Sequence, residues 1–325
     1  MLLPLLVYAL LLLLLFTLVK NYLLLPSNIP GPLLARLSNL YRALLVYQRS
    51  PHEVHLQLHK THGPLVRLGP NVVSVSGSAR YITQIYGIGK GLVKSDFYAC
   101  FQNIVNGRRA ASLVAVTDEA EHAKSKRLVA HAYSLSTLVE FEGLVDQTVD
   151  VFLSTLEERF TTPTKEGSAP VLDLGQYLQF FAFDVIGELT FSRRLGFIES
   201  GTDIDNIMSA IGANFDYFSV LGQIPWLDEA LLGKNPLYVR YFRKSVSSPI
   251  LQFAQARLKE RLRDIEDGSG AGGDEKSGAL LDKPDFLGRF LKVRKEDIEG
   301  GAEAMTDAAL LSNLFANINA GSDTS

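Results

Sequence analysis

The sequence of 325 residues contains a single cysteine, Cys100, and a single tryptophan. One cysteine cannot form a disulfide within the chain or supply a cysteine-cluster metal site. The sequence also lacks an excess of charge, because 32 basic residues stand against 35 acidic ones and the net charge is −3. This balance argues against nucleic acid as a partner. Hydrophobic residues are not scarce: at 47% of the chain, they are sufficient for a large buried core.

Charge is absent from the first segment, since no charged side chain occurs between Leu2 and Val19. An apolar run of this length is close to what a helix needs to cross the hydrocarbon layer. No basic residue follows Met1 and no small-residue cleavage motif follows the leucines, which favours an anchor over a cleaved signal peptide. The first basic residues all follow the run: Lys20, Arg36 and Arg42. We therefore predict a transmembrane anchor over 1–20 with the rest of the chain on the cytoplasmic side.

Prolines dominate the next segment, in which Pro26, Pro30 and Pro32 lie within seven residues of one another. Each proline fixes φ and removes a backbone donor, so neither a helix nor a strand continues through it. We predict a stiff hinge over 21–32 and a globular domain over 33–325.

The remaining sequence is typical of a mainly helical fold with a small β element. Two β-prone runs, 65–68 and 72–76, flank Gly69-Pro70-Asn71 and predict a hairpin. Apolar residues then recur at steps of three and four after a candidate cap at Ser136: Leu138, Phe141, Val145, Val149, Phe152 and Leu156. Further helices are predicted over 174–191, 239–265 and 305–325, with the glycine-rich stretch 268–273 as a surface loop.

Two other patterns are weak indications of a ligand site. Four histidines recur at helical spacing, like paired metal ligands: His52, His55, His59 and His62. A solvated helix face is the favoured interpretation, so no metal site is predicted. The glycines around Lys90 lack the Gly-Lys-Ser/Thr that a phosphate loop requires.

The apolar tip 224–227 is compatible with either core packing or contact with a bilayer.

Five segments, in the same order, resemble the fungal microsomal branch of the cytochrome P-450 family. They are Ile29-Pro30-Gly31-Pro32, the hairpin 62–71, the stretch 86–98, Asp184–Phe191 with Gly196-Phe197, and the terminal Ala320-Gly321-Ser322-Asp323-Thr324-Ser325. The resemblance implies a heme-thiolate monooxygenase that inserts oxygen into a lipophilic small molecule, in a setting of secondary metabolism. It further implies electrons from NADPH through a separate reductase, and a place in the endoplasmic reticulum membrane.

The resemblance also implies roles for the terminal motif. In the family, this motif lies in the long I helix and activates oxygen. Gly321 after Ala320 would let the helix open beside dioxygen, and Asp323 and Thr324 would pass protons. The alternative is a polar helix end, in which Asp323 and Thr324 bond only to local backbone.

A second set of implied cofactor ligands is basic. The family binds the heme propionates with a tryptophan or histidine followed, after three residues, by arginine. His122 and Lys126 match that spacing, and Arg127 follows directly. The lysine ammonium is a point charge, whereas the guanidinium of the family's arginine is planar and can donate two parallel hydrogen bonds. Arg127 could compensate for this difference. The alternative is a solvated basic helix face.

The heme-ligating cysteine loop of the family lies beyond the I helix and is not in this sequence. Cys100 stands between apolar aromatic residues, which indicates a small buried or semi-exposed hydrophobic residue and not a thiolate ligand. We therefore expect a truncated chain that is inactive by itself. The alternative is a non-catalytic membrane-anchored remnant that binds apolar ligands or a partner protein. It would do so through a stripe expected to be partly uncovered: Leu310, Leu314 and Ile318.

Overall fold

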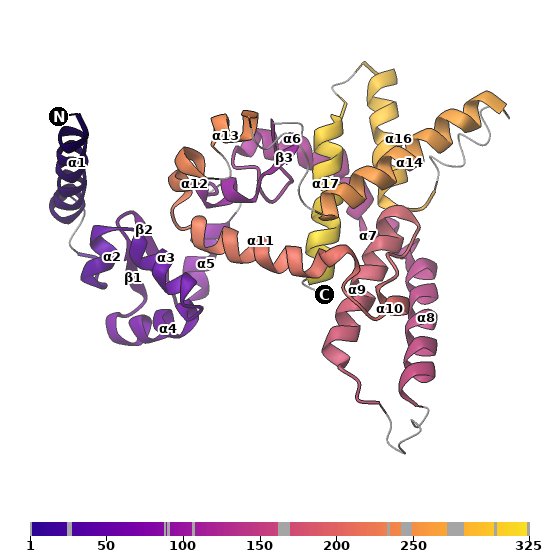
Figure 1. Cartoon of the computed structure of the whole chain (residues 1–325), viewed down its shortest axis with the longest axis horizontal. Coiled ribbons are helices and arrows are strands. Elements are labelled where there is room, and N and C mark those ends of the chain that lie inside the picture. The colour runs from indigo at the N-terminus through magenta and orange to yellow at the C-terminus, as the bar shows by residue number, and fades with distance from the viewer. Residues whose placement is uncertain are drawn as a thin grey trace. The chain divides into compact units, whose positions relative to one another are not determined.

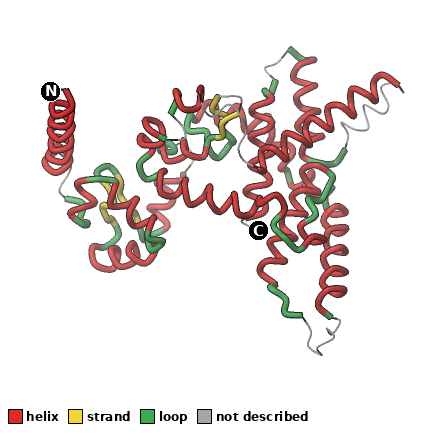
Figure 2. Tube along the Cα trace, viewed as in Figure 1, coloured by secondary structure: helices red, strands yellow, loops and turns green. Residues whose placement is uncertain are grey.

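The computed structural model describes residues 2–24, 28–87, 89, 92–105, 108–161, 170–232, 235–241, 249–271, 283–301 and 304–323. The chain divides into two compact units. The first comprises Met1–Cys100 and Phe215–Pro236, and the second comprises Phe101–Asn214 and Leu237–Ser325. Helices predominate in both (Figures 1 and 2), so the predicted mainly helical class with small β elements is confirmed.

Most elements of the first unit lie in its first hundred residues. They are α1 (Leu2–Leu24), α2 (Leu33–Leu37), α3 (Leu40–Tyr47), α4 (Pro51–His62), β1 (Leu65–Gly69), β2 (Val72–Val75), α5 (Ala79–Tyr86) and the 3-10 helix η1 (Asp96–Phe101). Helix α12 (Pro225–Leu231) joins them, and α11 (Ile207–Leu221) contributes residues to both units.

The predicted hairpin forms at the expected place. Strands β1 and β2 pair antiparallel, with Leu65 opposite Val75 and an irregular register between Arg67 and Gly69. The Arg67 side chain is only 4% exposed, and its Nη1 donates to the carbonyl of Pro70 at 2.6 Å. The buried guanidinium therefore stabilises the turn between β1 and β2.

The segment predicted as a stiff hinge over 21–32 is described in part. Helix α1 continues to Leu24, so residues 21–24 are helical, and 25–27 lie outside the described residues. Further on, the Arg67 amide donates to the Pro30 carbonyl at 2.8 Å. Gly31 has a φ of +157°, and a Cβ there would lie 2.5 Å from the Arg67 carbonyl oxygen. The end of the segment is thus packed on β1, which only a glycine permits.

Helix α1 covers the predicted anchor, and two side chains of its last turn contact the next helix or residues beside it. Asn21 donates from Nδ2 to the Leu37 carbonyl at 2.8 Å, and the Arg36 guanidinium lies over the Tyr22 ring. Within the part of the chain that the structure describes, none of the helices has the combination of length and hydropathy needed to cross a bilayer. The segment predicted as an anchor over 1–20 is helical as part of α1, Leu2–Leu24, which contacts α2 at its C-terminal end.

The second unit contains the remaining elements. They are β3 (Asn103–Val105), β4 (Arg108–Ala110), α6 (Glu119–Val129), the 3-10 helix η2 (Ala130–Tyr133), α7 (Leu135–Val139), α8 (Glu142–Phe160), α9 (Leu174–Phe191), α10 (Phe197–Ser200), the 3-10 helix η3 (Ile204–Asn206), α14 (Pro249–Ala271), α16 (Phe286–Glu299) and α17 (Asp307–Asp323), with α13 (Pro236–Tyr241) beginning at the boundary. Strands β3 and β4 pair antiparallel.

The core of the second unit is formed around α9. This helix packs against α8, α10, α16 and α17, and Figure 1 shows α8 and α9 side by side. Its Phe183 ring stacks on Phe197 of α10, with the ring centroids 4.7 Å apart, and both side chains are fully buried. An amphipathic helix that buries aromatic rings against several neighbours is stabilised mainly by this packing.

Three predicted helix boundaries are corrected. The cap is Ser134, not Ser136: its side chain accepts from the Thr137 amide and begins the short α7, after which α8 starts at Glu142. The helix predicted over 239–265 is described as α13 and α14, with 242–248 outside the described residues. Helix α14 also includes 268–271, where a glycine loop was predicted.

Candidate functional site

Helix α17 carries the terminal motif and is the central helix of the candidate site. It packs chiefly against α9 and α14. Leu310, Leu314 and Ile318 are all 0% exposed. The expectation that this stripe would be partly uncovered is therefore wrong, because two neighbouring helices of the same chain cover it. Sequence periodicity identified the apolar face but could not show which element packs on it.

The residues of the terminal motif, at the end of α17, differ in their exposure. Ala320 is exposed, and Gly321 is half-buried. Asp323 is the last described residue, and its side chain, like all of Thr324, lies outside the described residues. The helix runs without interruption through Gly321, which does not have a positive φ. The predicted opening of the helix at this glycine is thus not observed.

Gly321 is instead required by a helix contact. A Cβ at this position would lie 2.8 Å from both Cγ1 and Cδ1 of Ile186 on α9. That separation is too short for a real side chain, so glycine allows α17 and α9 to approach closely here.

The predicted propionate ligands lie together on α6. Asp118 caps this helix, since its side chain accepts from the Glu121 amide at 2.8 Å. His122 is half-buried, whereas Lys126 and Arg127 are exposed. A spacing of four places His122 and Lys126 on one face. The principal neighbours of α6 are η2 and α16, so the structure does not show these three residues packed against the end of α17.

The single cysteine is buried. Cys100 lies in η1 of the first unit, is 1% exposed and forms no disulfide. Its interpretation as a small buried or semi-exposed hydrophobic residue is confirmed.

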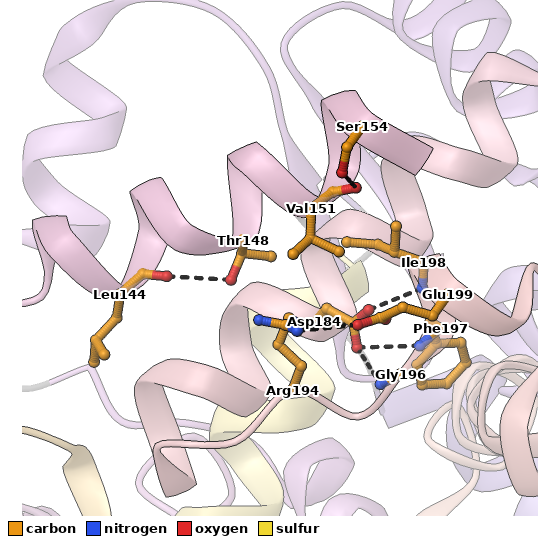
Figure 3. A network of polar contacts seen from close by, with 10 residues as sticks. All are labelled: Leu144, Thr148, Val151, Ser154, Asp184, Arg194, Gly196, Phe197, Ile198 and Glu199. Carbon is orange, nitrogen blue, oxygen red and sulfur yellow. Dashed lines mark hydrogen bonds and ion pairs between the residues drawn. The ribbon is translucent and has the colours of Figure 1, made fainter. Parts of the chain in front are cut away.

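Asp184 is a buried functional group to which the sequence pattern assigned no role. Its carboxylate is 0% exposed and accepts three backbone N–H bonds, from Gly196 at 2.7 Å, Phe197 at 3.2 Å and Ile198 at 2.8 Å. Figure 3 shows these donors converging on one side chain. Burial raises the pKa of Asp184, and the three N–H donors offset part of that rise. The only sequence signal of this role is an aspartate in the interior of a mostly apolar helix.

Tyr133 and Asn317 form a second polar contact in this unit. The Tyr133 hydroxyl donates to Oδ1 of Asn317 at 2.5 Å, which links η2 to α17 one turn before Ala320. The Tyr133 ring also lies against Phe286, with the centroids 4.9 Å apart. Desolvation of the Tyr133 hydroxyl, which points at Asn317, raises its pKa to about 12, and the bond to Asn317 acts in the opposite direction; the residue as a whole is 40% exposed.

Comparison with known proteins decides the family, since the cytochrome P-450 family profile matches residues 29–325. The chain belongs to the cytochrome P-450 family. It is 42% identical over 308 residues to a cytochrome P-450 monooxygenase of Aspergillus terreus, covering 95% of this chain and 58% of that protein. A cytochrome P-450 monooxygenase of Aspergillus flavus is 37% identical, with coverage of 91% and 55%. A third, from Penicillium roqueforti, is 37% identical, with coverage of 92% and 32%. The chain therefore spans about half, or less, of the length of these curated relatives.

The cytochrome P-450 family implies heme, and the residues of this chain fit one part of a heme site. The cations of α6 suit the carboxylates of heme, and the exposed Ala320 provides a small apolar surface on α17. The described residues do not provide an axial sulfur that fits: Cys100 lies in the short 3-10 helix η1 between apolar aromatic residues and is 1% exposed. The described part of the chain thus offers donors for the heme carboxylates but not a thiolate.

Proposed function

We propose that this chain forms the oxygen-activating side of a fungal monooxygenase that inserts one oxygen atom into a lipophilic small molecule, in secondary metabolism. The observation that carries the proposal is the family match over 29–325, together with a continuous α17 that ends in Ala320, Gly321 and Asp323. When bound, heme would supply the activation of dioxygen.

Each implied residue has a chemical task in this proposal. His122, Lys126 and Arg127 hold the heme carboxylates by charge-assisted hydrogen bonds. Ala320 and Gly321 leave space beside the helix, while Asp323 and Thr324 deliver protons to the site of oxygen reduction. Electrons come from NADPH through a separate reductase. Because no described cysteine can act as the thiolate, this chain by itself is inactive.

The proposed location is the endoplasmic reticulum membrane, with the first segment as a single-pass anchor and the globular part in the cytoplasm. The side chains from Leu11 to Phe16 on α1 are all exposed and uncharged, which favours association with lipid. The other candidate role, a non-catalytic remnant that binds apolar ligands or a partner, relied on the stripe of α17. Because that stripe is buried, the surface on which the second role relied is not exposed.

Hemin titration of the complete chain tests the carboxylate site. We expect hemin to bind, and we expect binding to weaken about tenfold when Lys126→Ala and Arg127→Ala are combined, because two charge-assisted contacts are lost. Lys259→Ala with Arg263→Ala on α14 is the matched control, since both of these side chains are also exposed. Equal weakening by the two pairs would contradict the assignment.

Carbon monoxide spectroscopy of the reduced complex tests the axial ligand. The expected spectrum lacks a thiolate-type Soret band and is unchanged by Cys100→Ser. A thiolate-type band that disappears in Cys100→Ser would show that the sulfur comes from this chain.

A further inference from the structure

One close contact links two motifs that lie far apart in the sequence. Ile186 belongs to the segment Asp184–Phe191 on α9, and Gly321 belongs to the terminal motif on α17. A Cβ on Gly321 would be 2.8 Å from Cγ1 and Cδ1 of Ile186, and 3.4 Å from its Cβ. The Ile186 side chain therefore occupies the place that any larger residue at 321 would need.

Helix α9 is held firmly at this point. Two residues before Ile186, the Asp184 carboxylate accepts the amides of Gly196, Phe197 and Ile198. One residue after it, a Cβ on Gly187 would collide with the Leu195 side chain and lie 3.0 Å from the Arg193 carbonyl oxygen. The turn that follows α9 thus folds back onto the same stretch of helix and fixes its position.

The end of α9 is fixed as well. Ser192, its C-cap, donates from its hydroxyl to Asp285 at 2.6 Å. Asp285 in turn pairs with Arg261 of α14 at 2.7 Å, and both side chains are almost fully buried. Buried networks of this kind rigidify the elements that they join. Ile186 is accordingly presented to α17 by an anchored helix.

We propose that Ile186 is a positioning residue that sets the place of the last turn of α17 through Gly321. In this role, the stretch around Asp184 is the support against which the terminal motif is aligned. The inference rests on the proposed function, because the position of Asp323 and Thr324 matters for chemistry only if they move protons there. It also explains why residue 321 is a glycine without requiring the helix to open there.

The contact makes an unusual prediction about side-chain size. Isoleucine is β-branched and stiff at χ1, so it cannot easily turn away from a new methyl group on residue 321. Gly321→Ala should therefore displace the last turn of α17. Ile186→Ala removes Cγ1 and Cδ1 and leaves its Cβ 3.4 Å from the new Cβ, which is an ordinary contact. The double variant should consequently restore the alignment that the single glycine variant loses.

Amide hydrogen exchange on the complete chain tests this, in the absence of heme. The variants are Gly321→Ala, Ile186→Ala and their combination. We expect Gly321→Ala to speed exchange over 318–323 about tenfold, and the double variant to return within about threefold of the starting protein. Exchange in α8 serves as the internal reference.

Two controls separate this contact from general effects. Gly212 lies in the helix α11 and a Cβ there has no neighbour within 4 Å, so Gly212→Ala should not speed exchange. Leu178 is 49% exposed on α9, so Leu178→Ala should not rescue Gly321→Ala. The proposal is overturned if Gly321→Ala behaves like Gly212→Ala, or if the effects of Gly321→Ala and Ile186→Ala simply multiply in the double variant.

The outcome is independent of whether the chain binds heme. A failure of hemin to bind would contradict the proposed function and leave the exchange result intact. If Ile186→Ala did not rescue Gly321→Ala, the role of Ile186 would be contradicted, and the result of the hemin titration would not be affected.

Discussion

At the scale of single residues, Asp184 is the side chain whose loss should be most costly. Asp184→Ala leaves three backbone N–H groups without their acceptor, so we expect unfolding of the second unit to become easier by about 3 kcal/mol. Asp184→Asn keeps one acceptor oxygen and should lose less. Urea unfolding followed by far-ultraviolet circular dichroism measures the difference.

Asp150→Ala is the matched control for that measurement, because Asp150 is an exposed aspartate on the neighbouring helix α8. Exposed substitutions of this kind usually change stability by less than about 0.5 kcal/mol. Similar losses for the two alanine variants would mean that the three hydrogen bonds contribute little.

Tyr133 gives a prediction about alkaline pH. Its pKa of about 12 lies above the ordinary value of 10, so the folded state keeps the phenol protonated where the unfolded state has begun to ionise. The stability that this provides is complete below pH 10 and is lost as the pH rises towards 12. Ultraviolet titration of the phenolates should show a late-ionising component near pH 12 that is lost in Tyr133→Phe, while any late ionisation of Tyr41 remains. A difference spectrum with its midpoint near pH 10 would contradict the assignment.

Residue identities could be predicted better than residue roles. The sequence pattern found Gly321 but assigned its lack of a side chain to dioxygen, whereas the structure shows Ile186 against it. The sequence pattern placed a helix cap at Ser136, whereas the structure has Ser134 in that role. In each case the decisive fact is which atoms lie nearby, and this is not a local property of the sequence.

At the scale of helices, the buried pair of Arg261 and Asp285 connects three elements. Asp285 caps α16, accepts from Ser192 at the end of α9 and binds Arg261 of α14. Arg261→Ala leaves a fully buried carboxylate without its cation, so we expect a loss of about 3–5 kcal/mol. Thermal unfolding measures this loss.

Arg263→Ala, an exposed arginine on the same helix, provides the comparison. Its loss should be small, since an exposed arginine seldom contributes more than about 1 kcal/mol. If both arginine variants unfold at the same temperature, the buried pair is not what joins α9, α14 and α16.

At the scale of the whole molecule, the two units should respond separately to substitution. The only tryptophan, Trp226, lies in the first unit and is 63% exposed, so its fluorescence reports on that unit. Asp184 and Arg261 lie in the second unit. Either alanine variant should therefore shift the circular dichroism transition to lower urea and leave the Trp226 transition in place. Equal shifts of both signals would show that the chain unfolds as one cooperative body.

The sequence by itself determined the family, the helical class, the first hairpin and the apolar faces of α9 and α17, because these depend on periodicity and on short motifs that act locally. Only the tertiary structure decided that α9 and α14 cover the stripe of α17, that Ile186 requires a glycine at 321 and that Asp184 binds three distant amides. Those outcomes depend on contacts between residues that are far apart in the chain. Burial and close packing select such contacts, and no local pattern records them.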